Sequence, residues 1–360
     1  MKILILAPLP PYHEGGIERV VGEVAQRLAH SHDVDVWSGA IGRTRTCDWK
    51  GVNLRTYHAS RRAAYASLGM FMDLKRWAGD FDVVHAHGSG TLIPFLAGLA
   101  ADSSPLVLSP YFHPQTSNRF LGIIKPPFDR TVTAYNFRKA TKIVCVSETE
   151  AEIIRRRFAD TDRITVIFPG VNVEMIRDAK PYEFDGTLVL YVGRLERYKN
   201  IHSVLKAFKH LPKEFLFYIV GEGPYKNSLE SFIDHNGLSD RIKLLGALPD
   251  AEVYRYLKTS AVLVNLSEVE TFGITVLEAL AAGTPALVND RLGLSELAKR
   301  FNHAVFSIPA TTNARELAQM IFDVAGTDIG LADLDDFRWD RTAARTVKVY
   351  EEAYAAQLER

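Results

Sequence analysis

The 360-residue sequence has little of several features that would place it in a specialised class of protein. It contains only two cysteines, too few for a disulfide framework. Its longest apolar stretch, residues 92–101, is interrupted by Pro94 and is far shorter than the ~20 residues that a membrane-spanning helix needs. The apolar run before Pro8 is too short for the core of a signal peptide. We therefore expect a cytoplasmic protein.

The sequence also lacks net charge, because 43 Lys and Arg balance 43 Asp and Glu. No overall field would attract it to nucleic acid, so we expect no nucleic-acid partner. The basic residues are nevertheless concentrated, since eight of them and only two acidic residues lie between Arg43 and Arg76. This basic stretch is interpreted either as a solvated surface or as a contact for an anionic acceptor or an anionic lipid surface.

The length exceeds what one compact core supports, ~150 to 250 residues, so we expect two globular domains. Short apolar runs alternate with helical segments such as Ile17–Leu28, which is typical of parallel βαβ units. The predicted strands lie at 3–7, 34–37, 83–86, 106–109, 143–146 and 164–167, and again at 188–192, 215–220, 242–245, 262–264 and 286–288. The pattern predicts an α/β fold of two Rossmann-like, doubly wound domains.

The clearest linker begins at Pro169-Gly170 and divides the chain into residues 1–170 and 171–337. A final helix, at about 338–360, is expected to pack back on the first domain. Doubly wound sheets bind ligands in the loops at the carboxyl ends of their strands. We therefore expect the functional residues in those loops, facing a central cleft.

The first such loop ends in Gly15-Gly16, where the helix at Ile17 begins. Paired glycines let a ligand approach the backbone, and the N–H groups at a helix start favour phosphate. A turn without a ligand is the alternative. No G-x-G-x-x-G motif follows the first strand, which argues against a nicotinamide or flavin dinucleotide.

A second loop places Gly193, Arg194 and Lys199 between a strand end and a helix. Two cations there could clamp a diphosphate, and the glycine would leave room for it. The alternative is that both are ordinary surface charges.

A third loop carries Glu270 and Gly273 before a helix that contains Glu278 and ends at Gly283. Glu278 lies in an otherwise apolar segment, where an unpaired carboxylate would be costly. It needs a hydrogen-bonding partner, and sugar hydroxyls would serve.

These motifs, taken in chain order, resemble the retaining, nucleotide-sugar-dependent glycosyltransferases of family 4, which have the GT-B fold. The resemblance spans essentially the whole chain and rests on Gly15-Gly16, on Gly193-Arg194-Leu195 with Lys199, and on Glu270-x7-Glu278 around Phe272-Gly273-Ile274. It implies an N-terminal acceptor domain and a C-terminal donor domain. The resemblance implies transfer of a sugar, expected to be a hexosyl group, from a UDP- or GDP-sugar to a hydroxyl of a glycan, a lipid or a small metabolite.

The resemblance also implies roles for individual residues. Arg194 and Lys199 would bind the donor diphosphate next to Gly193, and Glu278 would bind the donor ribose. Glu270, with the backbone of Phe272, Gly273 and Ile274, would hold the transferred sugar. Gly15 and Gly16 would border the phosphates, and His113 would reach the donor sugar. No metal or other cofactor is implied beyond the nucleotide-sugar co-substrate.

Other interpretations stay open at this point. His85 and His87 share one face of a strand and form either a metal pair or, as we favour, a structural or acceptor contact. Segments 61–77 and 119–125 mix basic and apolar residues, which would suit a peripheral contact with the inner face of a membrane or a domain-packing face. The rival functions are another GT-B chemistry, such as a phosphorylase or a nucleotide-sugar epimerase, and a silent nucleotide-sugar-binding scaffold.

Overall fold

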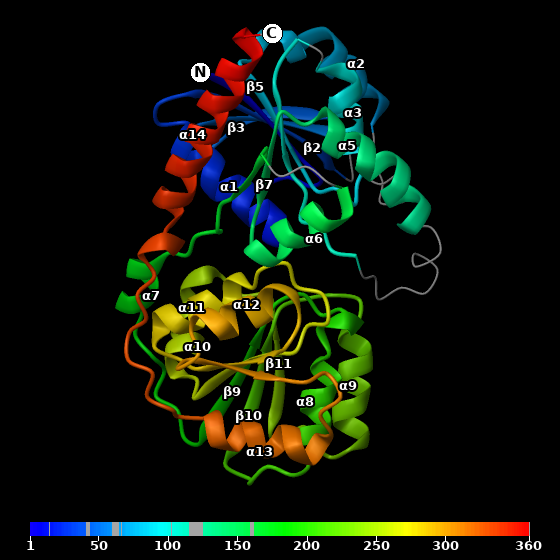
Figure 1. The fold of residues 1–360 in the computed structure, drawn as a ribbon. Coiled ribbons are helices and arrows are strands. Elements are labelled where there is room, and N and C mark those ends of the chain that lie inside the picture. Colours follow the sequence, from blue (N-terminus) through cyan, green and yellow to red (C-terminus); the bar gives the residue numbers. More distant parts are fainter. Residues whose placement is uncertain are drawn as a thin grey trace. The chain divides into compact units, whose positions relative to one another are not determined.

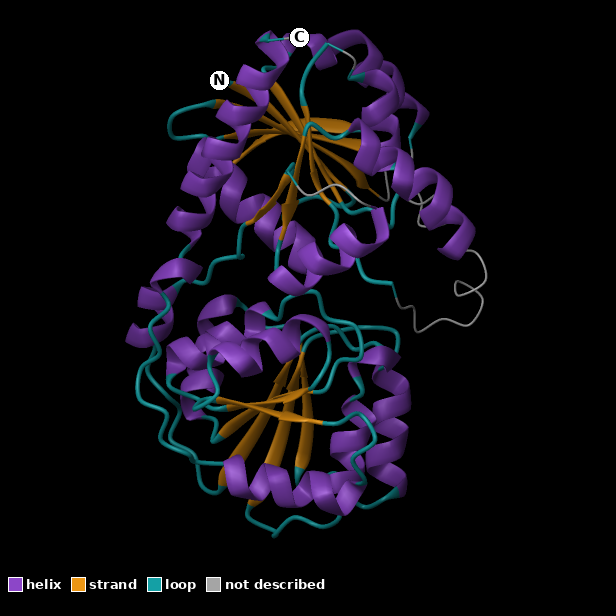
Figure 2. Ribbon diagram, in the orientation of Figure 1, coloured by secondary structure: helices purple, strands orange, loops and turns teal. Residues whose placement is uncertain are grey.

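The computed structural model describes residues 1–13, 15–40, 44–59, 65, 67–101, 103–114, 125–158 and 162–359. The chain divides into two compact units, which we describe separately. Unit 1 comprises Met1–Gly170 and Asp336–Arg360, and unit 2 comprises Val171–Asp335. In each, helices cover both faces of one twisted sheet (Figures 1 and 2). The predicted α/β class with two Rossmann-like domains is confirmed.

Unit 1 contains an eight-stranded sheet in the order β3-β4-β2-β1-β5-β6-β7-β8. Only β3 runs antiparallel to its neighbour. The strands are β1 (Lys2–Ala7), β2 (Asp33–Ala40), β3 (Arg45–Trp49), β4 (Val52–His58), β5 (Val83–His87), β6 (Leu106–Ser109), β7 (Lys142–Cys145) and β8 (Ile164–Val166). The hairpin formed by β3 and β4 was not predicted, because β3 is polar and four of its five residues are exposed.

The helices of unit 1 are α1 (Gly16–Leu28), α2 (Leu68–Trp77), α3 (Ile93–Ala100), α5 (Ala134–Lys139), α6 (Glu148–Phe158) and α14 (Trp339–Leu358). A π-helical turn, Asp129–Thr133, precedes α5. The apolar face predicted for α1 is buried, namely Val20, Val21, Val24 and Leu28. Helix α14 belongs to unit 1, where it lies along α1 (Figure 1) and where Asp340 pairs with Arg27 at 2.7 Å.

Unit 2 contains a six-stranded parallel sheet in the order β11-β10-β9-β12-β13-β14. Its strands are β9 (Thr187–Val192), β10 (Phe215–Val220), β11 (Ile242–Gly246), β12 (Val262–Asn265), β13 (Ala286–Asn289) and β14 (Val305–Ile308). Its helices are α7 (Val173–Asp178), α8 (Ile201–Ala207), α9 (Lys226–His235), α10 (Asp250–Thr259), α11 (Ile274–Ala282), α12 (Leu292–Arg300) and α13 (Ala314–Val324). The edge strand β14 was not predicted; only two of its four residues are buried, so it lacks the continuous apolar run of the predicted strands β12 and β13.

Helix α11 is buried on most of its surface, which explains its apolar sequence. It begins at Gly273 and ends at Gly283, which both have positive φ angles (107° and 79°). Glycine reaches such angles without the steric penalty of a side chain. The predicted limits of this helix are therefore confirmed, and they fix the loop that precedes it.

Candidate functional site

The strand order of unit 2 locates its topological switch point. From β9 the chain proceeds to β10 and β11 on one side of the sheet, and then returns to β12 on the other side of β9. The loops after β9 and β12 therefore diverge, and such a switch point is where doubly wound sheets bind ligands. The site residues predicted within unit 2 lie on these two loops or on the helix that follows the second.

Two of the predicted residues meet across this switch point. The Lys199 Nζ atom lies 2.5 Å from Glu270 Oε2, although 70 residues of chain separate them. Their side chains are 15% and 22% exposed, so the pair is partly accessible. Burial lowers the pKa of Lys199, but the Glu270 carboxylate outweighs that effect, and the net pKa lies above its ordinary value. The lysine therefore carries a positive charge in this site at neutral pH.

Arg194 lies on the same loop but has a different partner. Its guanidinium pairs with Glu196 at 2.9 Å, and its side chain is 40% exposed. Its backbone is fixed by Tyr191, whose hydroxyl donates a hydrogen bond to the Arg194 carbonyl oxygen at 2.9 Å. Gly193 between them has a φ of 148°. Tyr191 was not predicted as a site residue. Its position, two residues before Gly193 at the end of a strand, was the only indication in the sequence.

A neighbouring glycine-rich loop supports the Arg194 loop by direct backbone packing. A Cβ atom on Gly221 would lie 2.1 Å from the Gly193 carbonyl oxygen, and one on Gly223 would lie 2.3 Å from that of Leu195. Leu195 N–H also donates to the Glu222 carbonyl at 2.9 Å. Gly221 and Gly223 are thus required for this close approach, and the backbone of their loop holds the cation-bearing loop in place.

The Glu270 loop is held in a similar way. Gly293, at the start of α12, donates its N–H to the Glu270 carbonyl at 3.1 Å. A Cβ atom on Gly293 would lie 2.4 Å from the Thr271 carbonyl oxygen, so only glycine fits. Phe272 is buried and anchors the loop, and Gly273 begins α11. The positive end of the α11 dipole therefore lies close to Glu270 in sequence. Gly293 was not among the predicted site residues.

Glu278 differs from Glu270 in its surroundings. It lies in the middle of α11 and is only 1% exposed, whereas Glu270 is partly accessible. Ile274, at the first position of the same helix, is half-buried. The structure thus places one predicted carboxylate at the accessible switch point and the other inside the helix layer. A ribose contact for Glu278 stays a prediction.

Three predicted residues lie in unit 1. Gly15 and Gly16 follow β1 at the start of α1, and Gly16 faces open space because a Cβ atom there would meet nothing within 4 Å. The strand order shows that β1 and β5 flank the switch point of this unit. His113 is half-buried on the segment that follows β6. The residue before Gly15 lies outside the described residues.

His85 and His87 are buried at the end of β5 and are hydrogen-bonded to protein groups. His85 Nδ1 lies 2.7 Å from the Tyr350 hydroxyl and its Nε2 lies 2.9 Å from Ser109 Oγ. His87 Nδ1 lies 3.2 Å from the Tyr111 hydroxyl. Burial lowers the pKa of His85 far below its ordinary value and that of His87 to about 3, so both are neutral. These contacts favour the structural interpretation, and within the described ranges no three His, Cys, Asp or Glu side chains gather as metal ligands would.

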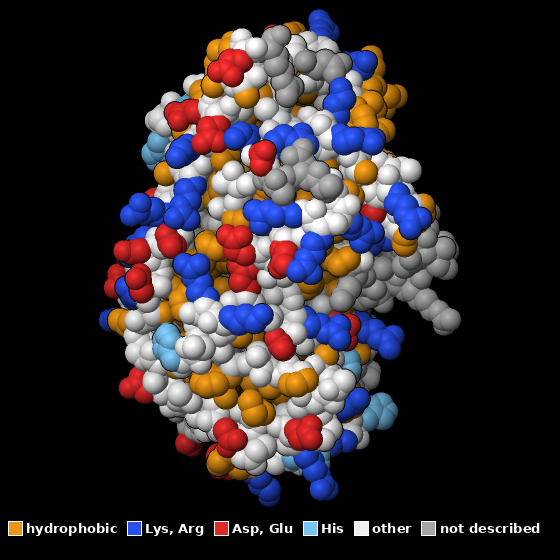
Figure 3. Space-filling model, viewed as in Figure 1, with side chains coloured by type: hydrophobic (Ala, Val, Ile, Leu, Met, Phe, Trp, Pro, Cys, Tyr) orange, Lys and Arg blue, Asp and Glu red, His pale blue; other side chains and the backbone are white. Residues whose placement is uncertain are grey.

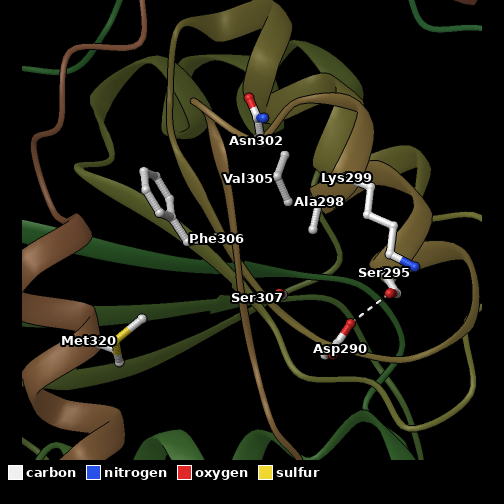
Figure 4. A pocket seen from close by; sticks show the side chains of 9 residues that line it. All are labelled: Asp290, Ser295, Ala298, Lys299, Asn302, Val305, Phe306, Ser307 and Met320. Atoms are coloured by element: carbon white, nitrogen blue, oxygen red, sulfur yellow. Dashed lines mark hydrogen bonds between the residues drawn. The ribbon is translucent and has the colours of Figure 1, made fainter.

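An open cavity of about 550 Å³ lies elsewhere in unit 2 (Figure 4). In its lining the Ser295 hydroxyl donates a hydrogen bond to Asp290 Oδ1 at 2.6 Å. None of the predicted site residues lines it; its lining residues are Asp290, Ser295, Ala298, Lys299, Asn302, Val305, Phe306, Ser307 and Met320. It follows the edge strand β14 rather than the switch point, and we assign it no role.

Part of the predicted basic stretch forms α2. This helix exposes Leu68, Met72 and Trp77 (77%, 59% and 40%) next to the exposed side chains of Lys75 and Arg76. Apolar and basic side chains lie together over this region in Figure 3. Arg43, Arg61 and Arg62, together with most of segment 119–125, lie outside the described residues. Among the helices that the structure does describe, none combines the length and apolarity needed to span a bilayer.

Comparisons with known proteins agree with this geometry. The family described as Glycosyltransferase Family 4 matches residues 14–175, and the family described as Glycosyl transferases group 1 matches residues 173–324. An uncharacterized glycosyltransferase of Methanocaldococcus jannaschii is 24% identical, over 97% of this chain and 98% of that protein. D-inositol 3-phosphate glycosyltransferase of Streptomyces bingchenggensis is 29% identical, over 77% and 69%. Among solved structures, Anabaena HepE in complex with UDP-glucose has the same fold, with a TM-score of 0.79, 17% identity and coverage of 98% and 100%.

Proposed function

Because this chain belongs to the family 4 glycosyltransferases of the GT-B fold, we propose that it transfers a hexosyl group from a nucleoside-diphosphate sugar to an acceptor hydroxyl, with retention at the anomeric carbon. The observation that carries the proposal is the ion pair between Lys199 and Glu270 at the switch point of unit 2. This pair supports the proposal because a cation can bind a diphosphate, a carboxylate can bind sugar hydroxyls, and the switch point is where doubly wound sheets bind ligands.

The costly step of such a transfer is departure of the nucleoside diphosphate, which gains negative charge as the bond to the sugar breaks. Fixed positive groups that face this charge lower the barrier. In our proposal Lys199 and Arg194 supply two cations, and the N-terminus of α11 supplies a third positive end. Tyr191 then acts by fixing the loop of Arg194, and Gly293 by fixing the loop of Glu270.

We nominate no covalent nucleophile. Glu270 would be the candidate by analogy with retaining glycosidases, in which a carboxylate attacks the anomeric carbon. Here its carboxylate is engaged by Lys199, which supports a role in binding sugar hydroxyls instead. The leaving phosphate oxygen would accept the proton of the acceptor hydroxyl, so that the new glycosidic bond forms on the face from which the diphosphate departs.

UDP-glucose is the first donor to test, because the related fold of HepE binds it. GDP-sugars are the second class. The acceptor is proposed to be a hydroxyl of a glycan, a lipid or a small metabolite, contacted through unit 1. We expect no metal requirement, since protein cations take the task that a metal ion has in other transferases. Turnover should therefore persist in excess EDTA, and its loss would contradict this expectation.

The test is a screen of UDP- and GDP-sugars for thermal stabilisation, followed by transfer assays with the donors that bind. A ligand at 100 times its dissociation constant stabilises the folded state by about 2.7 kcal/mol. NMR of the first-formed product then reports the anomeric configuration. Inversion would refute the retaining mechanism.

The same experiment separates the rival functions. A nucleotide-sugar epimerase would change the sugar without an acceptor, and a phosphorylase would release a sugar phosphate from a glycan when inorganic phosphate is added. A silent scaffold would bind the donor without transfer to any acceptor. The paired charges at the switch point favour transfer over this last alternative, because a scaffold has no need to stabilise a departing diphosphate.

We also propose that α2 contacts an anionic membrane surface. Its outer face combines three exposed apolar side chains with Lys75 and Arg76, which is the composition that favours anionic bilayers. Flotation with phosphatidylcholine vesicles should recover the protein only when phosphatidylglycerol is included. Trp77→Ser should reduce recovery, while Leu331→Ser, at another exposed apolar residue, should not. Absence of flotation on anionic vesicles would refute the contact, and the inner-face location in the cell stays a prediction.

A further inference from the structure

The segment that leads to His113 is fixed by its backbone. Gly88 donates its N–H to the Ser109 carbonyl at 2.9 Å, and Ser89 donates to the Pro110 carbonyl at 2.8 Å. These bonds attach the end of β6 to the loop that follows β5. These bonds therefore fix the backbone at Pro110, at the carboxyl edge of the sheet, where the switch point of unit 1 also lies.

Tyr111, the next residue, has a strained backbone. Its φ is 49°, in the left-handed region that bulky side chains avoid. The strain persists because the side chain is held: its hydroxyl lies 3.2 Å from His87 Nδ1, and the two rings stack with centroids 5.9 Å apart. Backbone strain that surrounding contacts hold in place is concentrated at functional sites, where it fixes the orientation of nearby groups.

Phe112 is anchored on its backbone and its ring. Its N–H donates to the buried Glu150 carboxylate, whose other oxygen accepts from the Val146 N–H at 2.8 Å. The ring is 2% exposed, packs edge-on against Phe158 and lies under the Arg157 guanidinium, 5.5 Å away. The backbone thus turns sharply at Tyr111 and is fixed again at Phe112, so that His113 follows directly from a rigid platform.

We propose that Tyr111 is a positioning residue for the transfer reaction. Its left-handed conformation, held by His87 on one side and by the Glu150 bond to Phe112 on the other, aims the His113 imidazole. This inference rests on the proposed function and on the role that the family resemblance implies for His113, namely that its side chain reaches the donor sugar. It assigns Tyr111, His87 and Glu150 a task that none of the sequence motifs indicates. Tyr111 acts through His113 and does not itself need to touch substrate.

A double-mutant cycle tests whether Tyr111 acts through His113. Tyr111→Phe removes the hydroxyl that His87 contacts, and we expect kcat to fall about 10-fold with little change in the donor KM, since misplacement of a reacting group acts on the chemical step. In the His113→Ala background the same change should have less than about a 2-fold effect. Tyr135→Phe is the matched control, because it removes a hydroxyl bond to the Gly98 carbonyl in the same unit. It should leave kcat unchanged.

Equal losses in both backgrounds would overturn the proposal, as would unchanged kcat in Tyr111→Phe. A second readout does not need turnover. The imidazole resonances of His113, identified by their absence in His113→Ala, should shift and broaden in Tyr111→Phe and in Tyr111→Gly, but not in Tyr135→Phe. Unchanged His113 resonances would overturn the positioning role, whereas absence of transfer by the wild-type protein with any nucleotide sugar would refute only the proposed function.

Discussion

Each unit contains its own doubly wound sheet with one switch point, but the side chains beside the two switch points differ in charge. In unit 2 the switch point holds a partly exposed ion pair, Lys199 with Glu270. In unit 1 the neighbouring strand ends hold two buried, neutral histidines hydrogen-bonded to tyrosine and serine hydroxyls. Charge suits a loop that must bind a diphosphate, whereas neutral groups suit a loop that must keep one shape, because a buried charge would be costly there. If both proposals hold, the comparison teaches that the same architecture serves ligand binding in one unit and the positioning of a side chain in the other.

The largest expected effect comes from removing the cation of unit 2. Lys199→Ala should reduce kcat/KM for the sugar donor by about 10² to 10³-fold, because the variant lacks one fixed positive charge that would stabilise the departing diphosphate. Steady-state kinetics measure this loss. The exposed Lys206→Ala in the same unit should behave like the wild type. Activity of Lys199→Ala within 2-fold of wild type, on the order of experimental scatter, would contradict the assignment.

A change at Glu270, the partner of Lys199, separates the two roles proposed for this ion pair. Glu270→Gln should lower turnover by about 10²-fold through lost sugar contacts, yet UDP should bind at least as tightly as before, since the lysine charge is no longer neutralised. Calorimetry with UDP and kinetics with the sugar donor separate the two effects. Glu222→Gln, which breaks the exposed pair with Lys226, serves as control. If UDP affinity fell in parallel with turnover, Glu270 would act mainly by holding the lysine.

The neutral histidines make unit 1 sensitive to acid. The folded-state pKa of His87 is lowered to about 3 and that of His85 is lowered as well, mainly by burial. Below the ordinary value of about 6.5 the unfolded chain takes up protons that the folded protein does not. The free energy of unfolding should therefore fall as the pH decreases, by about 1.4 kcal/mol per pH unit for each histidine. Stability is thus full above pH ~6.5 and declines progressively toward the lowered pKa.

Denaturant unfolding at pH 7, 6 and 5, values chosen on either side of the ordinary histidine pKa of ~6.5, measures this slope. His87→Asn should flatten it, whereas His235→Asn, at the exposed end of α9, should keep the wild-type slope. A slope that His87→Asn leaves unchanged would show that another group dominates the acid sensitivity.

The smallest expected effect concerns the support of the Glu270 loop. Gly293→Ala would bring a methyl group against the Thr271 carbonyl, and the displaced loop should lower turnover by about 10-fold. Gly69→Ala on α2 has room for the methyl group and should not affect turnover. Kinetics of both variants, with thermal melting to check the fold, decide the matter. Equal activity of the two variants would mean that the Glu270 loop adjusts without loss.

The sequence indicated most of the fold because apolar strands and amphipathic helices repeat in a local pattern. It failed where the pattern is weak: β3 is mostly exposed, and only two of the four residues of β14 are buried. The candidate site was found in part. Gly193, Arg194, Lys199, Glu270 and the limits of α11 come from local motifs, but contacts between loops distant in the chain do not.

Three features, two in unit 2 and one in unit 1, therefore escaped prediction. The pairing of Lys199 with Glu270 joins loops that follow different strands, although the strand order, once known, explains it. Gly293 was overlooked because a single glycine does not reveal the backbone that it contacts. The strain at Tyr111 could not be predicted, because glycine is the residue whose presence in a sequence indicates a positive φ angle.

A crystal structure with bound UDP is the most direct test of the central claim, that the loops after β9 and β12 form a diphosphate site. The account predicts diphosphate oxygens within hydrogen-bonding distance, about 3 Å, of Lys199 Nζ and of the Arg194 guanidinium. A UDP molecule bound elsewhere on unit 2, with Lys199 and Glu270 still paired and no phosphate beside them, would contradict it.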